Sequence, residues 1–171
     1  ELAGELKGTT YSVVAPADVN SNLVAVNVKG SFPSVKSREG QFFYDHPQNR
    51  FWKVIAAVFE CDVTETIEEK KKLLFENGVA LWDVIASCEI EGSADSSIKN
   101  VKVNDLSKIL NEADIKAIFI NGKTAEKYFK KDTKPKIKRD ALCLPSTSPA
   151  NAAWSVERLC EKWKVIKEIQ R

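Results

Sequence analysis

The chain has 171 residues, of which 43% are hydrophobic and 29% are charged. This composition is that of a globular protein and excludes disordered and collagen-like classes. The net charge of +2 is too small to indicate a binding partner, so only local charge clusters can indicate one. No apolar run approaches the roughly 20 residues of a membrane span. Because residues 1–22 show no clear hydrophobic period, we predict an arm over 1–22 and a single domain over 23–171.

Short apolar strands alternate with helices along the rest of the chain. In chain order, the pattern predicts a strand at Leu23–Val28, helices at Gln48–Phe59, Thr64–Gly78 and Asn104–Glu112, a strand at Ile115–Ile120, a helix at Gly122–Lys131, a strand at Ala141–Leu144 and a helix at Ala152–Ile169. Val79–Ile90 is apolar and fits either a strand or a helix. The alternation predicts an α/β fold, a three-layer α/β/α domain with a short central parallel sheet.

The helical spacing also predicts the core. The residues expected to face inward are Phe51, Trp52, Ile55, Val58 and Phe59 in the first helix, Ile67, Leu74 and Phe75 in the second, and Val156, Leu159, Cys160, Trp163 and Ile166 in the last. Trp82 and Trp154 are expected in the core as well, and Thr64 can cap the second helix.

The four cysteines, Cys61, Cys88, Cys143 and Cys160, are scattered and form no C-x-x-C pair. The single histidine, His46, is not near any of them in the sequence. This spacing argues against a zinc site and favours buried free thiols. An iron–sulfur cluster with scattered ligands is the less favoured alternative.

In parallel α/β sheets the functional site lies beyond the carboxyl ends of the strands. Three segments follow those ends here, namely Gly30–Asn49, Asn121–Lys123 and Pro145–Asn151. They are rich in amides and hydroxyls and poor in carboxylates, and they contain no cysteine. The composition therefore disfavours a glycosidase carboxylate pair or a cysteine nucleophile, and it suits contacts with phosphate.

One segment is strongly basic. Lys123 to Arg139 contains eight basic residues against Glu126 and Asp132, a net charge of +6 in 17 positions. Such a run can be a phosphate-facing patch. It can equally be a solvated lysine-rich helix and loop, which is common.

Four motifs in this chain occur in a familiar order. They are G-S-F-P-S (Gly30–Ser34), H-P-Q-N-R-F-W (His46–Trp52), N-G-K-T-A (Asn121–Ala125) and L-P-S-T-S-P-A-N (Leu144–Asn151). Together they resemble the uracil-DNA glycosylase superfamily, in particular its hypoxanthine-DNA glycosylase branch, often called family 6. The second motif is also similar to that of the mismatch-specific uracil glycosylases. The resemblance runs from Leu23 to the C-terminus.

The resemblance implies a monofunctional DNA glycosylase, which flips a deaminated base out of double-stranded DNA and hydrolyses its N-glycosidic bond. Hypoxanthine at deoxyinosine sites is the expected base, and its removal would initiate base excision repair. Uracil in G:U mispairs, xanthine, and a non-catalytic DNA-binding relative are the alternatives. The resemblance implies no metal and no cofactor. We expect a monomer in the cytoplasm, associated with the nucleoid through DNA and not with a membrane.

The asparagine of H-P-Q-N is regarded as catalytic in this branch, which implies that role for Asn49. A neutral amide is no strong base, but it can orient a water and stabilise charge as the sugar becomes oxocarbenium-like. The same side chain can also cap the following helix. Phe32 is a base-binding candidate, and it stands at the position where many relatives have a water-positioning Asp or Asn. His46 and Gln48 are further candidates, although a lone histidine beside proline is more often structural.

Two other side chains are expected to hold the base. Tyr44 corresponds to an aromatic residue that stacks on the flipped base, or it packs on the core. Asn121 can accept from a ring N–H and donate to the adjacent carbonyl, a pair that hypoxanthine, xanthine and uracil present and adenine reverses. Asn121 can also be a turn residue before Gly122.

The remaining candidates are expected to contact DNA. They are Gly30, Ser31, Pro33, Ser34, Lys123, Ser146, Thr147, Ser148, Pro149, Ala150 and Asn151. Ser148 is the best phosphate ligand by its place in the motif, and Pro149 and Ala150 occupy the positions of the wedge that enters the base stack. Lys29 and Asp45 depart from the family pattern, and Asp45 would bring a negative charge near the DNA phosphates.

Overall fold

Four parallel strands form the central sheet of the protein, in the order β4-β3-β7-β8. Their bounds are β3 (Leu23–Asn27), β4 (Val79–Asp83), β7 (Ala117–Asn121) and β8 (Leu142–Leu144). The structure is a computed structural model that describes residues 2–6, 9–13, 23–27, 43–44, 47–89, 99–112 and 115–169. The three strands predicted from apolar runs are β3, β7 and β8, and the segment that fitted either a strand or a helix supplies β4.

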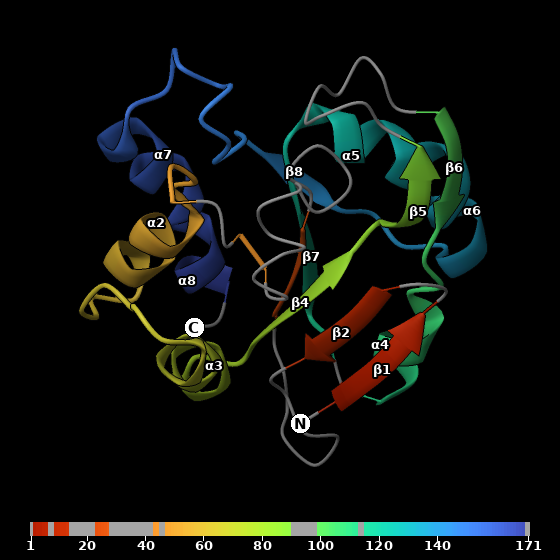
Figure 1. Cartoon of the computed structure of the whole chain (residues 1–171), viewed down its shortest axis with the longest axis horizontal. Helices are drawn as coiled ribbons and strands as arrows, with labels where there is room; N and C mark the ends of the chain where they lie inside the picture. The colour runs from red at the N-terminus through yellow and green to blue at the C-terminus, as the bar shows by residue number, and fades with distance from the viewer. Residues whose placement is uncertain are drawn as a thin grey trace.

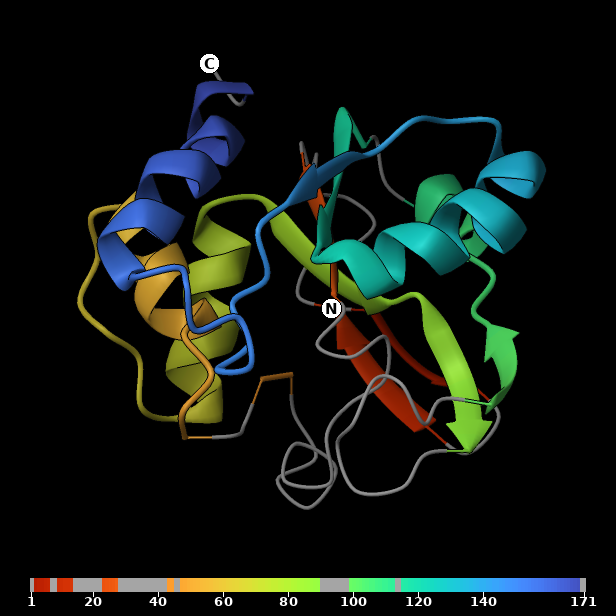
Figure 2. The same cartoon turned by 90° about the horizontal axis from the view of Figure 1, so that it is seen from above.

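Helices cover both faces of this sheet (Figures 1 and 2). One face carries α2 (Phe51–Val58), α3 (Ile67–Glu76), α7 (Val156–Trp163) and α8 (Val165–Ile169). The other carries α4 (Ser107–Glu112), α5 (Lys123–Tyr128), the π-helix η3 (Phe129–Thr133) and α6 (Lys134–Ile137). The predicted three-layer α/β/α architecture is confirmed.

Two antiparallel pairs complete the described strands. β1 (Leu2–Leu6) pairs with β2 (Thr9–Val13), and both lie within the segment expected to be an arm. The division into an arm and a domain stays a prediction. β5 (Ile85–Glu89) pairs with β6 (Lys99–Val103), so the ambiguous apolar segment forms two successive strands, β4 and β5.

The core follows the helical pattern most closely at α2. Its five expected inward residues, Phe51, Trp52, Ile55, Val58 and the following Phe59, are all buried. At the other end of the chain Leu159, Trp163 and Ile166 are fully buried, while Val156 and Cys160 are partly buried. α2, with six of its eight residues buried, packs against α7, which buries the stripe formed by Leu159 and Trp163.

The expected start of the second helix was wrong. α3 begins at Ile67 with Thr66, not Thr64, as its cap. The Thr66 hydroxyl accepts from the Glu69 N–H at 3.1 Å, and the Glu69 carboxylate accepts from the Thr66 N–H at 3.1 Å. This capping box satisfies two backbone donors at once, which decides between the two threonines.

The inward face of α3 was also only partly right. Leu74 is buried, but Ile67 and Phe75 are 39% and 41% exposed, and Leu73 takes the second inward position. The helix carries six charged residues among its ten. It therefore buries only a narrow stripe and leaves both ends of its apolar set at the surface.

The C-terminal helix begins later than expected and is divided. Ser155 caps α7 by accepting from the Arg158 N–H at 3.2 Å, so residues 152–154 stay outside the helix. Lys164 separates α7 from α8. Trp154 is consequently only half-buried, whereas Trp52, Trp82 and Trp163 are in the core as predicted.

The cysteine side chains that the structure describes are less buried than predicted. Cys61 is exposed, since it follows the last turn of α2, while Cys143 and Cys160 are half-buried. All three are free thiols, and the side chain of Cys88 lies outside the described residues. Burial raises the pKa of the Cys143 thiol to about 11. No helix in the described part of the chain is long and apolar enough to cross a membrane.

Candidate functional site

The order of the strands defines where a ligand can bind. β3 lies between β4 and β7, so the connection from β3 leads to one side and the later strands are added on the other. Such a change of direction opens a crevice beyond the carboxyl ends of the central strands. β7 ends at Asn121 and β8 leads into Pro145–Asn151, as expected from the sequence.

Two buried carboxamides meet there through one threonine. The Thr147 hydroxyl lies 3.0 Å from Asn49 Oδ1 and 2.9 Å from Asn121 Nδ2. The Thr147 backbone N–H donates to Asn121 Oδ1 at 3.1 Å. All three residues are buried and uncharged. The sequence placed Asn49 and Asn121 in one site, and the structure joins them through a residue assigned only to DNA contact.

Asn49 also contacts the start of α2. Its Oδ1 accepts from the Phe51 N–H at 2.9 Å, so the side chain satisfies one of the free backbone donors at this helix end. The Asn49 side chain therefore does bind the first turn of α2, as the capping interpretation expected, but the N-cap position itself is occupied by Arg50. Asn49 Nδ2 is buried and has no hydrogen-bond partner among the described residues.

Tyr44 is held in a conformation that few aromatic residues adopt. Its φ is 54°, in the left-handed region. The ring stacks on Phe51 with centroids 4.1 Å apart, and the hydroxyl accepts from Asn121 Nδ2 at 2.9 Å. Backbone strain of this kind persists where the surroundings fix it and is common at functional sites. Tyr44 therefore borders the carboxamide pair, with its ring packed on the core.

The loop after β8 holds its shape through its own side chains. Ser146 Oγ accepts from the Ser148 N–H at 3.1 Å, and Ser148 Oγ accepts from the Ala150 N–H at 3.2 Å. Asn151 Nδ2 donates to the Ser146 carbonyl at 3.0 Å. These successive turns expose Ala150 and leave Pro149 half-buried.

Gly122 allows this loop to approach the end of β7. Its φ of 95° and ψ of 165° are accessible almost only to glycine. A Cβ at this position would meet Ser146 Cβ at 3.0 Å. Gly122 also donates to the Leu144 carbonyl at 2.9 Å, which keeps the two strand ends side by side.

Arg50 binds the same loop from the other side, a role that the sequence did not reveal. Its guanidinium donates to the carbonyl oxygens of Thr147 at 3.3 Å, Ser148 at 2.8 Å and Asn151 at 3.0 Å, and to that of Trp154. Arginine suits this task because its planar fork presents five fixed donors. These partners lie 97 to 104 residues away, so no local pattern could have shown them.

Two tryptophans predicted only as core residues also position the site. Trp52 Nε1 donates to the Phe43 carbonyl at 3.0 Å and so fixes the residue before Tyr44. Trp163 Nε1 donates to the Pro145 carbonyl at 3.0 Å and fixes the start of the loop. The indole N–H of a buried tryptophan needs such an acceptor.

The basic segment begins beside the site with a local ion network. Glu126 accepts from Lys123 at 3.0 Å and from Lys130 at 2.7 Å, and these lysines lower the pKa of Glu126 to about 2. The same contact raises the pKa of Lys123, whose side chain is exposed. Farther along, Lys134 pairs with Asp140 at 2.5 Å, and the Arg139 side chain donates to the Lys116 carbonyl.

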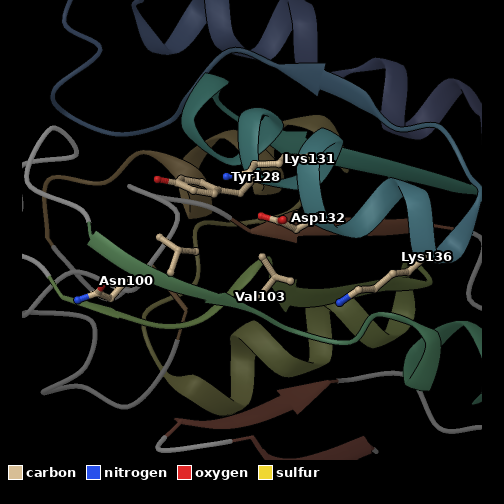
Figure 3. Close-up of a pocket in the computed structure, with 7 residues that line it drawn as sticks. Asn100, Val103, Tyr128, Lys131, Asp132 and Lys136 are labelled. Atoms are coloured by element: carbon tan, nitrogen blue, oxygen red, sulfur yellow. The ribbon is translucent and has the colours of Figure 1, made fainter.

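A cavity of about 370 Å³ lies apart from the carboxamides, between β6 and the segment from α5 to α6 (Figure 3). Its lining residues are Asn100, Val101, Val103, Tyr128, Lys131, Asp132 and Lys136. None of them was predicted as a site residue. Three of the lining residues are exposed and four are half-buried, and the cavity shares no residue with the carboxamide site.

The structure brings together Asn49, Tyr44, Asn121 and Thr147 from three separate segments. Gln48 is exposed next to them. Several residues singled out in the sequence lie outside the described residues. They are Lys29 and the first motif, Gly30–Ser34 with Ser31, Phe32 and Pro33, and also Asp45 and His46 at the second motif. Their predicted roles stay predictions.

The comparison with protein families fits this geometry. The family described as the Uracil DNA glycosylase superfamily matches residues 19–170. This chain belongs to that superfamily. The match includes all four sequence motifs and the whole carboxamide site, and it begins before β3.

Two relatives of this chain come from species of Methanosarcina. The chain is 31% identical over 156 residues to a hypoxanthine DNA glycosylase of Methanosarcina acetivorans, covering 88% of this chain and 94% of that protein. A hypoxanthine DNA glycosylase of Methanosarcina barkeri is 29% identical over 103 residues, 59% of this chain and 65% of that protein. The solution NMR structure of a candidate uracil DNA glycosylase from M. acetivorans superposes with a TM-score of 0.76 at 29% identity, covering 94% and 97% of the two chains.

Proposed function

We propose that this protein is a monofunctional DNA glycosylase that removes hypoxanthine from deoxyinosine sites in double-stranded DNA. Membership of the superfamily supports the reaction, and the two relatives named hypoxanthine DNA glycosylase support the base. The observation that carries the proposal is the buried Asn49 carboxamide beyond the carboxyl ends of the sheet, with an N–H₂ group that no described residue binds.

In the proposed reaction the damaged nucleotide leaves the base stack and enters the site. The N-glycosidic bond breaks, the departing base takes the bonding electrons, and water adds to the sugar carbon. The base is released with a proton, and an abasic site remains. Asn49 assists by orienting the water and by stabilising charge that develops in the transition state, which a fixed amide dipole can do in a buried site.

Asn121 and Tyr44 would recognise the base. Asn121 Oδ1 keeps a second lone pair for the ring N–H, and its Nδ2 would exchange the Tyr44 hydroxyl for the adjacent base carbonyl. Adenine presents the opposite donor and acceptor pattern and would leave these buried groups unpaired. The Tyr44 ring, already stacked on Phe51, would extend this stack onto the base.

Lys123 and the residues of the loop Ser146–Asn151 that flank the buried Thr147 would contact the DNA strand. Ser148 Oγ accepts from Ala150 N–H and keeps its own proton for a phosphate oxygen. Ala150 is exposed at the position of the wedge, and its small size would favour bases that are already poorly paired.

We place the enzyme as a monomer in the cytoplasm, bound to the nucleoid through DNA.

Uracil excision is the second candidate, because the matching family is named for uracil and the second motif is similar to that of the mismatch-specific enzymes. Xanthine presents the same donor and acceptor pair as hypoxanthine and is a further candidate. The carboxamide pair by itself does not separate these bases.

A single-turnover excision assay tests the proposal. Duplexes carrying inosine, xanthine or uracil are incubated with the wild type and with Asn49→Ala, and abasic sites are cleaved by alkali. We expect inosine to be cleaved fastest and Asn49→Ala to slow cleavage about 100- to 1000-fold, the range for removal of a transition-state donor. Cleavage of uracil alone would favour the second candidate. DNA binding without cleavage of any base would contradict the glycosylase assignment and indicate a non-catalytic relative.

A further inference from the structure

Thr147 is fully buried, and each of its polar atoms is bound within the protein. Its carbonyl accepts from Arg50, its N–H donates to Asn121, and its hydroxyl lies between Asn121 and Asn49. A residue in this state offers nothing to a DNA phosphate. Its contacts instead join the two carboxamides of the site.

The direction of these hydrogen bonds follows from two backbone donors. A backbone N–H can only donate, so Phe51 N–H requires Asn49 to turn its oxygen toward it, and Thr147 N–H requires the same of Asn121. Asn121 must then donate its Nδ2 to the Thr147 hydroxyl. The single Thr147 proton is left for Asn49 Oδ1, which thus accepts two hydrogen bonds.

This arrangement decides which half of Asn49 is available. The oxygen is occupied by Phe51 and Thr147, while Nδ2 is the buried atom without a partner among the described residues. A carboxamide held at one end by two donors cannot rotate by 180° without losing both bonds. Asn49 therefore presents N–H donors and not its carbonyl.

We propose that Thr147 is a positioning residue that orients Asn49 so that its N–H₂ group faces the substrate. This inference rests on the proposed function and refines the role of Asn49, which then acts as a hydrogen-bond donor. Its partner would be the oxygen of the attacking water or an acceptor on the departing base, where negative charge develops. Without the Thr147 hydroxyl, only the Phe51 N–H would bind the Asn49 oxygen, and the carboxamide could turn by losing a single hydrogen bond.

Matched threonine variants test this role. Thr147→Val keeps the shape and removes the hydroxyl, and we expect single-turnover excision of inosine to fall about 100-fold, the cost of a misplaced reacting group. Thr147→Ser restores the hydroxyl and should recover most of that loss. The control is Thr133→Val in η3, which is also buried but whose hydroxyl has no described partner, and it should keep the wild-type rate.

A double variant separates positioning from general damage to the fold. Because Thr147 acts through Asn49, adding Thr147→Val to Asn49→Ala should cost little more than Asn49→Ala alone. DNA affinity should stay close to that of the wild type in both single variants. Wild-type excision by Thr147→Val, or full additivity of the two changes, would overturn the inference.

An NMR measurement decides the orientation whether or not any base is excised. A coupling across the hydrogen bond between the Phe51 amide nitrogen and Asn49 Cγ is expected in the wild type and in Thr147→Ser, and it should weaken or vanish in Thr147→Val. If the wild type lacks this coupling, or if Thr147→Val retains it unchanged, the inference fails. If no base is excised while the coupling behaves as expected, only the proposed function fails.

Discussion

The carboxamide site and the basic segment meet at Gly122 and are built in opposite ways. Asn49, Thr147 and Asn121 are buried, carry no charge, and are joined by hydrogen bonds whose directions are fixed by backbone N–H groups. Residues 123–139 carry a net charge of +6, and their basic side chains are mostly exposed. Three of these side chains, Lys123, Lys130 and Lys134, pair with nearby carboxylates.

The comparison shows that the feature most easily seen in the sequence, the charged segment, is not the one with the best-defined geometry. Charge is visible in a sequence, but an exposed ion pair is screened by water and holds geometry weakly. Single asparagines form no recognisable pattern in a sequence. A buried amide must nevertheless satisfy its hydrogen bonds and therefore takes one orientation. We expect substitutions near the carboxamides to affect stability and excision together, and those in the basic segment to act mainly on DNA binding.

Gly122→Ala should have the largest effect of the predicted changes. The left-handed φ and the contact with Ser146 Cβ predict a loss of about 3 kcal/mol in the free energy of unfolding. The Pro145–Asn151 loop would move to relieve the contact, so excision should fall as well. Urea unfolding and the single-turnover assay measure the two effects. Normal stability and activity would show that the loop does not depend on this close approach.

Arg50→Met should come next. Arg50 N–H, Asn151 N–H and Trp154 N–H still reach the carbonyls of Thr147, Ser148 and Asn151. Removing the guanidinium therefore leaves the Trp154 carbonyl without its side-chain donor, and we expect a loss of about 2 kcal/mol.

Arg50→Lys provides the matched control for this change. A lysine keeps the charge but cannot form the fork, so it should restore only part of the stability. Full restoration, measured by urea unfolding, would mean that the positive charge alone holds the loop. Hydrogen exchange of the loop amides would show whether the lost stability is local to residues 145–154.

Glu126→Gln should have a smaller and pH-dependent effect. Lys130 and Lys123 depress the pKa of Glu126 from 4.5 to about 2 in the folded protein, so the ionised form stabilises the fold above pH 4.5 and this contribution disappears as the pH falls toward 2. Because both lysines are largely exposed, we expect a loss of about 1 kcal/mol at pH 7.

Unfolding of the wild type and Glu126→Gln across this pH range gives the measurement. The two proteins should differ at pH 7 and converge as the pH falls toward 2. A difference that stays constant with pH would assign the effect to packing and not to the charge.

The smallest effects are expected for single lysines. Lys123→Gln should leave stability within about 0.5 kcal/mol but reduce the slope of log affinity for DNA against log salt by about 1, since Lys123 lies beside Asn121. Lys136→Gln, at the far end of the segment, should leave the slope unchanged. Equal reductions would extend the DNA surface along the whole basic segment and would weaken the contrast between the two regions.

Local patterns were enough for much of the fold. The apolar runs located β3, β7 and β8, and the spacing of Phe51, Trp52 and Ile55 identified the buried face of α2. They were not enough for helix ends such as Thr66, where two threonines offered similar caps and only the capping box with Glu69 decided between them.

The sequence by itself determined the family, the parallel sheet, and the three segments beyond its carboxyl ends, because motif order and hydrophobic period are encoded over short distances. Only the tertiary structure decided how those segments cooperate. Asn49 and Thr147 are 98 residues apart, and Arg50 reaches its carbonyl partners across similar distances. Which amide atom faces the substrate depends on backbone donors that the fold brings together, and hydrogen bonds of this kind leave no trace in local sequence.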